Sequence, residues 1–395
     1  MSPMRYLVLI ILLVLTATAQ SQESVSRKTF VALQKIEALV AEEQFDEALE
    51  QLEALAVNTA GNSYDNALVH QYLAHTSVQL DNPARARTAL ETALAVENLP
   101  DDLLLNLYIF YGTILLGDDE FELGREVLAK WYALETGPTP TQIFSFAYAT
   151  YMSDDVPGAR PLLERAIGDS SDPKQSWYQL YYRVLFDMKD YELAEDVLKG
   201  MIAREPGDEN NWRMLASHYL QLEESADGLA AMMIAYNNEL IESEADLKQL
   251  ASLWGYIDVP EKGARLLDEW IRTEKIEGDA DMLKQLGNLW LMSRERDNAI
   301  GVLTRAAELA PDGRTYELLG GVFFEEEKWD QAYTAYMDAI ETGGLEEPLR
   351  VSLLAGISAF NGGNNENARE ALDAAAASDS EELREQAESV LRELD

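Results

Sequence analysis

The chain has no cysteine among its 395 residues and only three histidines, which excludes several kinds of chemistry. Without thiols there is no disulfide, no cysteine nucleophile and no thiolate ligand for zinc. His70 and His75 lie five residues apart, so one helix does not present them on the same face, and His218 is remote in sequence. The sequence patterns GxxxxGKS/T, GxSxG and HExxH are also missing. We therefore expect no enzyme, with no catalytic residue, no metal and no cofactor.

Basic residues are scarce as well. The chain has 31 Lys and Arg against 71 Asp and Glu, a formal net charge of −40. A field of this sign repels polyanions, so nucleic acid and anionic lipid surfaces are excluded as general partners. It favours basic partners or a salt-rich habitat, and the simpler alternative is that the acids solvate outward helix faces.

Long apolar runs are limited to the N-terminus. Arg5 precedes the apolar run from Tyr6 to Leu15, and Ala17-Thr18-Ala19 matches a small-residue cleavage site. We expect residues 1–19 to be a signal peptide that is cleaved after Ala19. The run is too short to span a bilayer, although an uncleaved anchor is the alternative. No cysteine follows it for lipidation, so the mature chain is expected without direct membrane insertion, and in a Gram-negative cell it would be periplasmic.

The most informative feature is an internal repeat of about 35 residues. In Ala280 to Pro311, counted from Ala280 as position 1, Leu283, Leu286, Gly287, Trp290, Ala299, Leu303, Ala306 and Pro311 occupy positions 4, 7, 8, 11, 20, 24, 27 and 32. Ten copies begin near Thr29, Ala67, Leu105, Pro140, Gln175, Glu209, Glu244, Ala280, Gly313 and Leu349. Position 20 is alanine or glycine in all ten, and position 24 is large and apolar. The small residue allows the two helices of a pair to approach, and the large residue fills the space between them.

This pattern resembles the tetratricopeptide repeat (TPR). The resemblance implies an all-α fold, a right-handed TPR α-solenoid of about ten helix-turn-helix repeats with a C-terminal capping helix. We expect a short lead at 20–28, the TPR superhelix at 29–379 and the cap at 380–395. The cap is predicted by an apolar stripe of Leu383, Ala387, Val390, Leu391 and Leu394 opposite a charged face. The alternative is an irregular helical bundle with accidental periodicity.

In the TPR fold, positions 2, 5, 6, 9, 12 and 13 of the first helix face the concave groove. In the N-terminal half, these positions hold the aromatic residues Tyr72, Phe110, Phe144, Tyr148 and Tyr151. Further along, they hold the cations and amides Arg183, Arg213, Lys248, Gln249, Lys284 and Asn288. We expect these residues to form a partner-binding groove, and a row of cations at position 5 suggests an anionic group such as a peptide carboxylate. Two alternatives stay open: the rings belong to the core, or the cations pair with acids of neighbouring helices.

The mature chain also resembles the periplasmic TPR proteins encoded with TonB–ExbB–ExbD systems in Gram-negative bacteria. The likeness is carried by LLLNLYIFYGTILLGDDEFELGREVLAKWYAL, NNWRMLASHYLQLEESADGLAAMMIAYNNELI and LKQLASLWGYIDVPEKGARLLDEWI. It implies a scaffold that binds a protein or peptide, possibly a component of such a nutrient-uptake system. The alternatives are an adaptor in peptidoglycan or outer-membrane assembly, and a carrier of a small hydrophobic or glycan ligand held against the aromatic half.

Overall fold

A computed structural model describes residues 25–60, 63–257 and 259–394. The predicted signal peptide and its cleavage site lie outside these residues. The chain divides into two compact units, one up to Met201 and one from Ile202. No strand occurs in the described part of the chain, and none of its helices is both long and apolar enough to cross a membrane.

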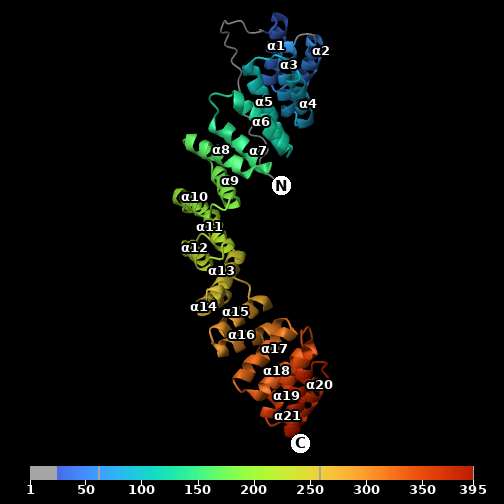
Figure 1. Ribbon diagram of the computed structural model, residues 1–395, viewed down its shortest axis with the longest axis vertical. Coiled ribbons are helices and arrows are strands. Elements are labelled where there is room, and N and C mark those ends of the chain that lie inside the picture. Colours follow the sequence, from blue (N-terminus) through green and yellow to red (C-terminus); the bar gives the residue numbers. More distant parts are fainter. Residues whose placement is uncertain (1–24, 61–62, 258, 395) are drawn as a thin grey trace. The chain divides into compact units, whose positions relative to one another are not determined.

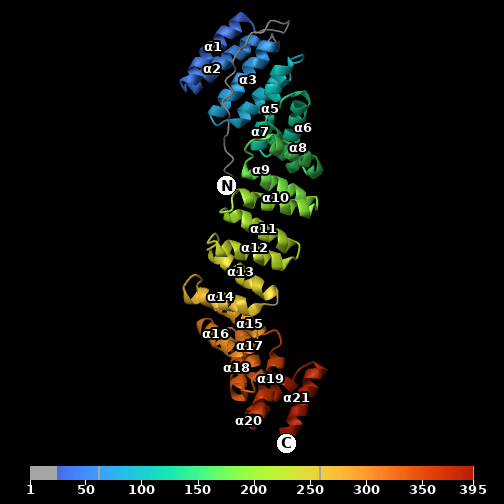
Figure 2. The ribbon, with the colours of Figure 1, turned by 90° about the vertical axis from the view of Figure 1, so that its left-hand side faces the viewer.

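The first unit consists of helices in pairs. They are α1 (Arg27–Ala41), α2 (Phe45–Thr59), α3 (Ser63–Gln79), α4 (Pro83–Leu94), α5 (Asp101–Gly117), α6 (Phe121–Leu134), α7 (Pro140–Met152), α8 (Val156–Asp169), α9 (Gln175–Asp187) and α10 (Tyr191–Arg204), near whose end the unit closes. Each odd-numbered helix is the first helix of a repeat (helix A), and the next is the second (helix B). Successive helices from α1 to α8 lie beside one another in Figures 1 and 2.

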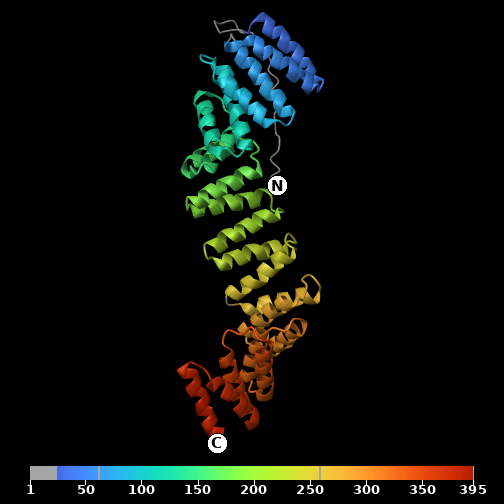
Figure 3. The same cartoon turned by 90° about the vertical axis from the view of Figure 1, so that its right-hand side faces the viewer.

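The second unit continues the same alternation. It contains α11 (Glu209–Gln221), α12 (Ser225–Asn237), α13 (Glu244–Tyr256), α14 (Pro260–Arg272), α15 (Ala280–Met292), α16 (Arg296–Leu309), α17 (Gly313–Glu325), α18 (Trp329–Thr342), α19 (Pro348–Asn361), α20 (Asn365–Ala376) and α21 (Glu381–Leu394). Within each unit, a helix contacts the next helix or the next but one. Figure 3 shows this order for the yellow-green ribbons of α11 to α14. Packing between near neighbours alone defines an α-solenoid, here of the TPR type.

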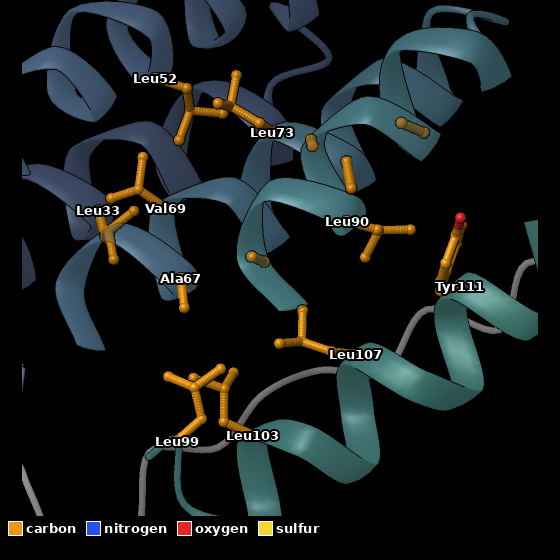
Figure 4. Packing of buried hydrophobic residues seen from close by; sticks show 14 of the residues in the cluster. Leu33, Leu52, Ala67, Val69, Leu73, Leu90, Leu99, Leu103, Leu107 and Tyr111 are labelled. Atoms are coloured by element: carbon orange, nitrogen blue, oxygen red, sulfur yellow. The ribbon is translucent and has the colours of Figure 1, made fainter. Parts of the chain in front are cut away.

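The small and large positions of the repeat pack as the sequence predicts. All ten residues at position 20 and all ten at position 24 are buried. The helix A residue at position 8 is the counterpart of position 24: a Cβ added to Gly287 would stand 2.6 Å from Leu303, and one added to Gly320 would stand 2.5 Å from Tyr336. Figure 4 shows part of the resulting core in the first unit, where Leu52, Leu73 and Leu90 come from three successive helices.

The first three A helices begin earlier than the sequence predicts. Helices α3 and α5 have 17 residues each, whereas every A helix from α7 to α17 has 13. The longer spacing of the first two repeats predicts longer loops at 57–63 and 97–101, but in the structure it mainly adds a helical turn. Helix α1 begins at Arg27, inside the predicted lead, because Ser26 caps it and Asp65 accepts hydrogen bonds from Ser26 N and Thr29 Oγ1 at 2.9 and 2.7 Å.

The turn between helices A and B has the same backbone form in the nine repeats whose position 15 is described. At position 15, eight residues other than glycine adopt φ between 54° and 63°, and Gly363 adopts 77° in the last repeat. This left-handed residue lets the next N–H donate to the carbonyl five residues earlier, as Glu120 does to Leu115 at 2.9 Å. The turn therefore fixes the residue at position 16, which immediately precedes helix B in these nine repeats.

The array ends on a capping helix. The side chains of Leu383, Ala387, Val390, Leu391 and Leu394 on α21 pack against a cluster that includes Leu353, Ala359 and Leu372. This is the apolar stripe that the sequence predicts. The charged residues of α21 lie on its other face and keep the last repeat in contact with water.

Candidate functional site

The predicted aromatic residues of the first unit are half-buried and tie successive A helices together. Tyr72 on α3 donates a hydrogen bond to Glu37, and Tyr151 on α7 donates to Asp187 on α9 at 2.8 Å. The remaining rings pack against other rings. The ring centroids are 4.2 Å apart for Phe110 and His75, 5.1 Å for Phe144 and Trp177, and 5.9 Å for Tyr148 and Phe121. These side chains therefore contribute to packing between repeats.

The histidines are packed in the protein rather than grouped. Burial lowers the pKa of His75, which stacks on Phe110, to about 4. His218 is buried on α11, and its ring centroid lies 5.7 Å from that of Tyr219. Among the described residues, no three His, Asp or Glu side chains are placed to hold a metal ion.

The three position-5 cations of the second unit lie on consecutive A helices, each beside acids. Arg213 on α11 donates to both carboxylate oxygens of Asp246 on α13, at 2.9 and 2.7 Å, and to Glu209 at 2.9 Å. Lys248 on α13 pairs with Glu244 at 2.7 Å. Lys284 on α15 contacts Asp281 at 2.8 Å and Asp312 at 3.7 Å.

These cations therefore pair with acids of their own and neighbouring helices. This is one of the two alternatives that the sequence leaves open. The hydrogen bond with Asp246 raises the pKa of Arg213 and, in return, lowers the pKa of Asp246. Five carboxylates surround the three cations, so the cluster is net negative. It therefore does not attract an anion as an isolated row of cations would.

Arg183 lies in the first unit, on α9. Its side chain is 65% exposed, and its Nε lies 3.4 Å from Asp187 Oδ1. The hydrogen bond with Tyr151 raises the pKa of Arg183. Arg183 thus belongs with the Tyr151 cluster of its own unit.

The predicted amides of the second unit remain available to a partner. Gln249 on α13 and Asn288 on α15 are exposed and make no hydrogen bond to any described residue. Gln285, next to Lys284, instead donates to Ser252 Oγ on α13 at 2.7 Å, which joins the two A helices. A free amide carries both donors and an acceptor, so it can pair with a peptide group of an extended chain.

Two exposed apolar residues at position 13 of the same helices were missed in the sequence. Tyr256 ends α13 with 77% of its surface exposed, and Met292 ends α15 with 54% exposed. Met292 packs over the turn that carries Tyr256, since its Cε lies 3.8 Å from the place of a Cβ on Gly255. The repeat numbering assigns position 13 to the concave face, and this is the signal that could have identified them.

A second set of contacts joins repeats along the B helices of the first unit. Arg87 on α4 donates through Nε to Glu91 at 2.9 Å and through Nη1 to Glu120, which precedes α6. Tyr111 on α5 donates to the same Glu91 at 2.7 Å. These two hydrogen bonds, from Tyr111 first, lower the pKa of Glu91.

The same arrangement recurs two repeats later. Arg160 on α8 donates to Glu164 at 2.8 Å and to Asp190 at 2.9 Å, and Tyr181 on α9 donates to Glu164 at 3.0 Å. In repeat numbering, an arginine at position 21 binds a glutamate at position 25 and an acid at position 16 of the next repeat. A tyrosine at position 7 of that next repeat completes the set.

Several solved structures resemble parts of the chain. YrrB, described as a TPR protein with an unusual peptide-binding site, is 19% identical with a TM-score of 0.39 over 49% of this chain and 97% of its own. MamA from Desulfovibrio magneticus is 20% identical with a TM-score of 0.36 over 44% and 96%. A TPR protein from Parabacteroides merdae is 14% identical with a TM-score of 0.36 over 65% and 100%. No protein-family model and no curated protein matches the sequence. The fold assignment therefore rests on the helix pairs of this chain.

Proposed function

We propose that the protein is a non-enzymatic scaffold that binds a polypeptide on the inward face of α11, α13 and α15. The observation that carries this proposal is that Tyr256 and Met292, at position 13 of consecutive A helices, are both exposed, and that Met292 lies beside Gly255, the residue before Tyr256. Single exposed apolar residues are ordinary, but a tyrosine and a methionine exposed at the same position of neighbouring helices are typical of binding surfaces. Methionine adapts its shape to a partner, and tyrosine adds a polar end to a large apolar area.

The surroundings of this pair fit a neutral or basic segment of a partner. Gln249 and Asn288 offer free amides to its backbone. The net-negative cluster around Arg213, Lys248 and Lys284 favours positive side chains, as does the net charge of −40. In the first unit, Tyr72, Phe110, Phe144, Tyr148, Tyr151 and Arg183 are proposed as a further part of the inward face.

The finer proposal concerns the place of action. The apolar N-terminal segment and the resemblance to TPR proteins of TonB–ExbB–ExbD systems support an exported, periplasmic accessory of a nutrient-uptake system. Affinity capture of the tagged full chain from membranes of the source cell tests this proposal. A component of that system among the captured proteins is expected. A reproducible partner from another system would reject this assignment and leave the scaffold itself in place.

We expect the double variant Tyr256→Ala/Met292→Ala to bind the captured partner at least about tenfold more weakly, since buried anchor residues contribute about 1–2 kcal/mol or more each. The measurement is calorimetric titration with purified partner. Leu309→Ala is the matched control, because Leu309 is 62% exposed at the end of helix B in the same unit. Equal affinity of the double variant and this control would contradict the proposal.

A further inference from the structure

The contacts along the B helices are incomplete between the third and fourth repeats. Arg125 on α6 occupies position 21, and its Nη1 reaches Asp155 at 3.3 Å, the acid at position 16 of the next repeat. Position 25 is Ala129 in place of a glutamate, and position 7 of the next repeat is Phe146 in place of a tyrosine. Both oxygen-bearing groups that complete the two neighbouring sets are therefore replaced by hydrocarbon.

The loss leaves a buried donor without an acceptor. Arg125 Nε is shielded from solvent and makes no hydrogen bond to any described residue. Its counterparts in Arg87 and Arg160 donate to Glu91 and Glu164 at 2.9 and 2.8 Å. A buried, unpaired N–H of a charged group costs free energy, and an acceptor supplied from outside would recover it.

A pocket lies where the missing groups would stand. It has a volume of about 600 Å³, and Ala129, Phe146 and Arg125 line it. Pro161 and Leu162 of α8 extend its apolar wall. Lys130 adds a second cation, and the carboxylates of Glu126 and Asp155 also line the pocket. Among the described residues, Lys130 has no ion-pair partner. The volume is within the range of small-molecule sites and exceeds what one glutamate side chain would fill.

We propose that this pocket binds a small amphiphilic carboxylate, such as a medium-chain fatty acid. Its carboxylate replaces the glutamate of the neighbouring repeats and accepts from Arg125 Nε, with Lys130 close by. Its hydrocarbon part lies against Phe146, Pro161 and Leu162. This site lies between B helices and does not depend on the proposed partner-binding face.

Calorimetric titration of the full chain with decanoate tests this inference. Wild-type protein is expected to bind decanoate and to bind decanol at least about tenfold more weakly, since a charge-assisted hydrogen bond contributes about 1.5–3 kcal/mol. Ala129→Glu is expected to abolish decanoate binding, because it restores the internal carboxylate in the arrangement that both neighbouring repeats already adopt.

The matched control is Ala133→Glu, which adds the same charge one turn further along α6 at another exposed position. It is expected to bind decanoate nearly as wild type does. Arg125→Gln gives a second test, with weaker binding expected, and circular dichroism of each variant checks that the helices remain. No binding by wild type, or equal binding by Ala129→Glu and Ala133→Glu, would overturn the proposal.

Discussion

Gly287→Ala is expected to destabilise the second unit by about 1–3 kcal/mol, although alanine is the better helix former. Gly287 is buried on α15, and a Cβ there would stand 2.6 Å from both Cγ and Cδ2 of Leu303 on α16. Leu303 is itself fully buried, so it has little room to move away. The measurement is native-state hydrogen exchange resolved to α15 and α16, because a repeat protein need not unfold in one step.

Leu303→Ala alone is expected to cost about 2–5 kcal/mol through the cavity that it leaves. In the double variant, the new methyl group at 287 occupies part of that cavity, so the total cost is expected to be about 0.5–3 kcal/mol below the sum. Gly301→Ala on α16 is the control. No atom lies within 4 Å of its Cβ position, so it is expected to gain up to about 1 kcal/mol. If Gly287→Ala were instead as stable as or more stable than the wild type, the close contact between position 8 and Leu303 would not restrict the residue at 287.

Arg213→Met is expected to destabilise the second unit by about 2 kcal/mol at pH 7. It leaves the Asp246 carboxylate, which is 9% exposed, with Ser243 but without its charged partner. Loss of one partner from a buried pair costs about 3–5 kcal/mol, and we expect less because Arg213 is 34% exposed and solvent screens the pair. Arg265→Met is the control, because its pair with Glu261 is exposed on both sides, and a change below about 0.5 kcal/mol is expected.

The pH dependence separates the ion pair from packing. Arg213 lowers the pKa of Asp246 in the folded chain, so this carboxylate stabilises the fold fully above its ordinary pKa of about 3.9. That stabilisation is lost as the pH falls through the lowered folded-state pKa. The cost of Arg213→Met should therefore shrink below about pH 4. A cost that stays constant from pH 7 to pH 3 would instead assign the effect to lost packing of the arginine side chain.

Much of the fold could be predicted from the sequence because the repeat imposes its own spacing. Helices α7, α9, α11, α13, α15 and α17 begin at the first residues of the predicted repeats. The residues at positions 20 and 24 pack against helix A of the same repeat, so their size can be predicted from the spacing alone. The lengths of α3 and α5 could not be predicted in the same way, because a turn added to a helix and a residue added to a loop lengthen the spacing equally.

The candidate site was harder to predict because its contacts join different repeats. The partners of Arg213 and Lys284 include Asp246 and Asp312, which belong to or precede the next A helix. Their proximity depends on how one repeat packs on another, and the periodicity does not state this. The changes at Ala129 and Phe146 are visible in aligned repeats, but their meaning requires the knowledge that positions 21, 25 and 7 of the next repeat meet.

Site-specific photo-cross-linking on the full chain in its native cells tests the central claim most directly. A photoreactive side chain placed at Asn288, on the inward face of α15, is expected to link to one defined polypeptide. The same group at Leu309, on the neighbouring helix B, is expected to give no such product. Linkage from Leu309 but not from Asn288, or from neither position, would contradict a scaffold that binds its partner on the face of the A helices.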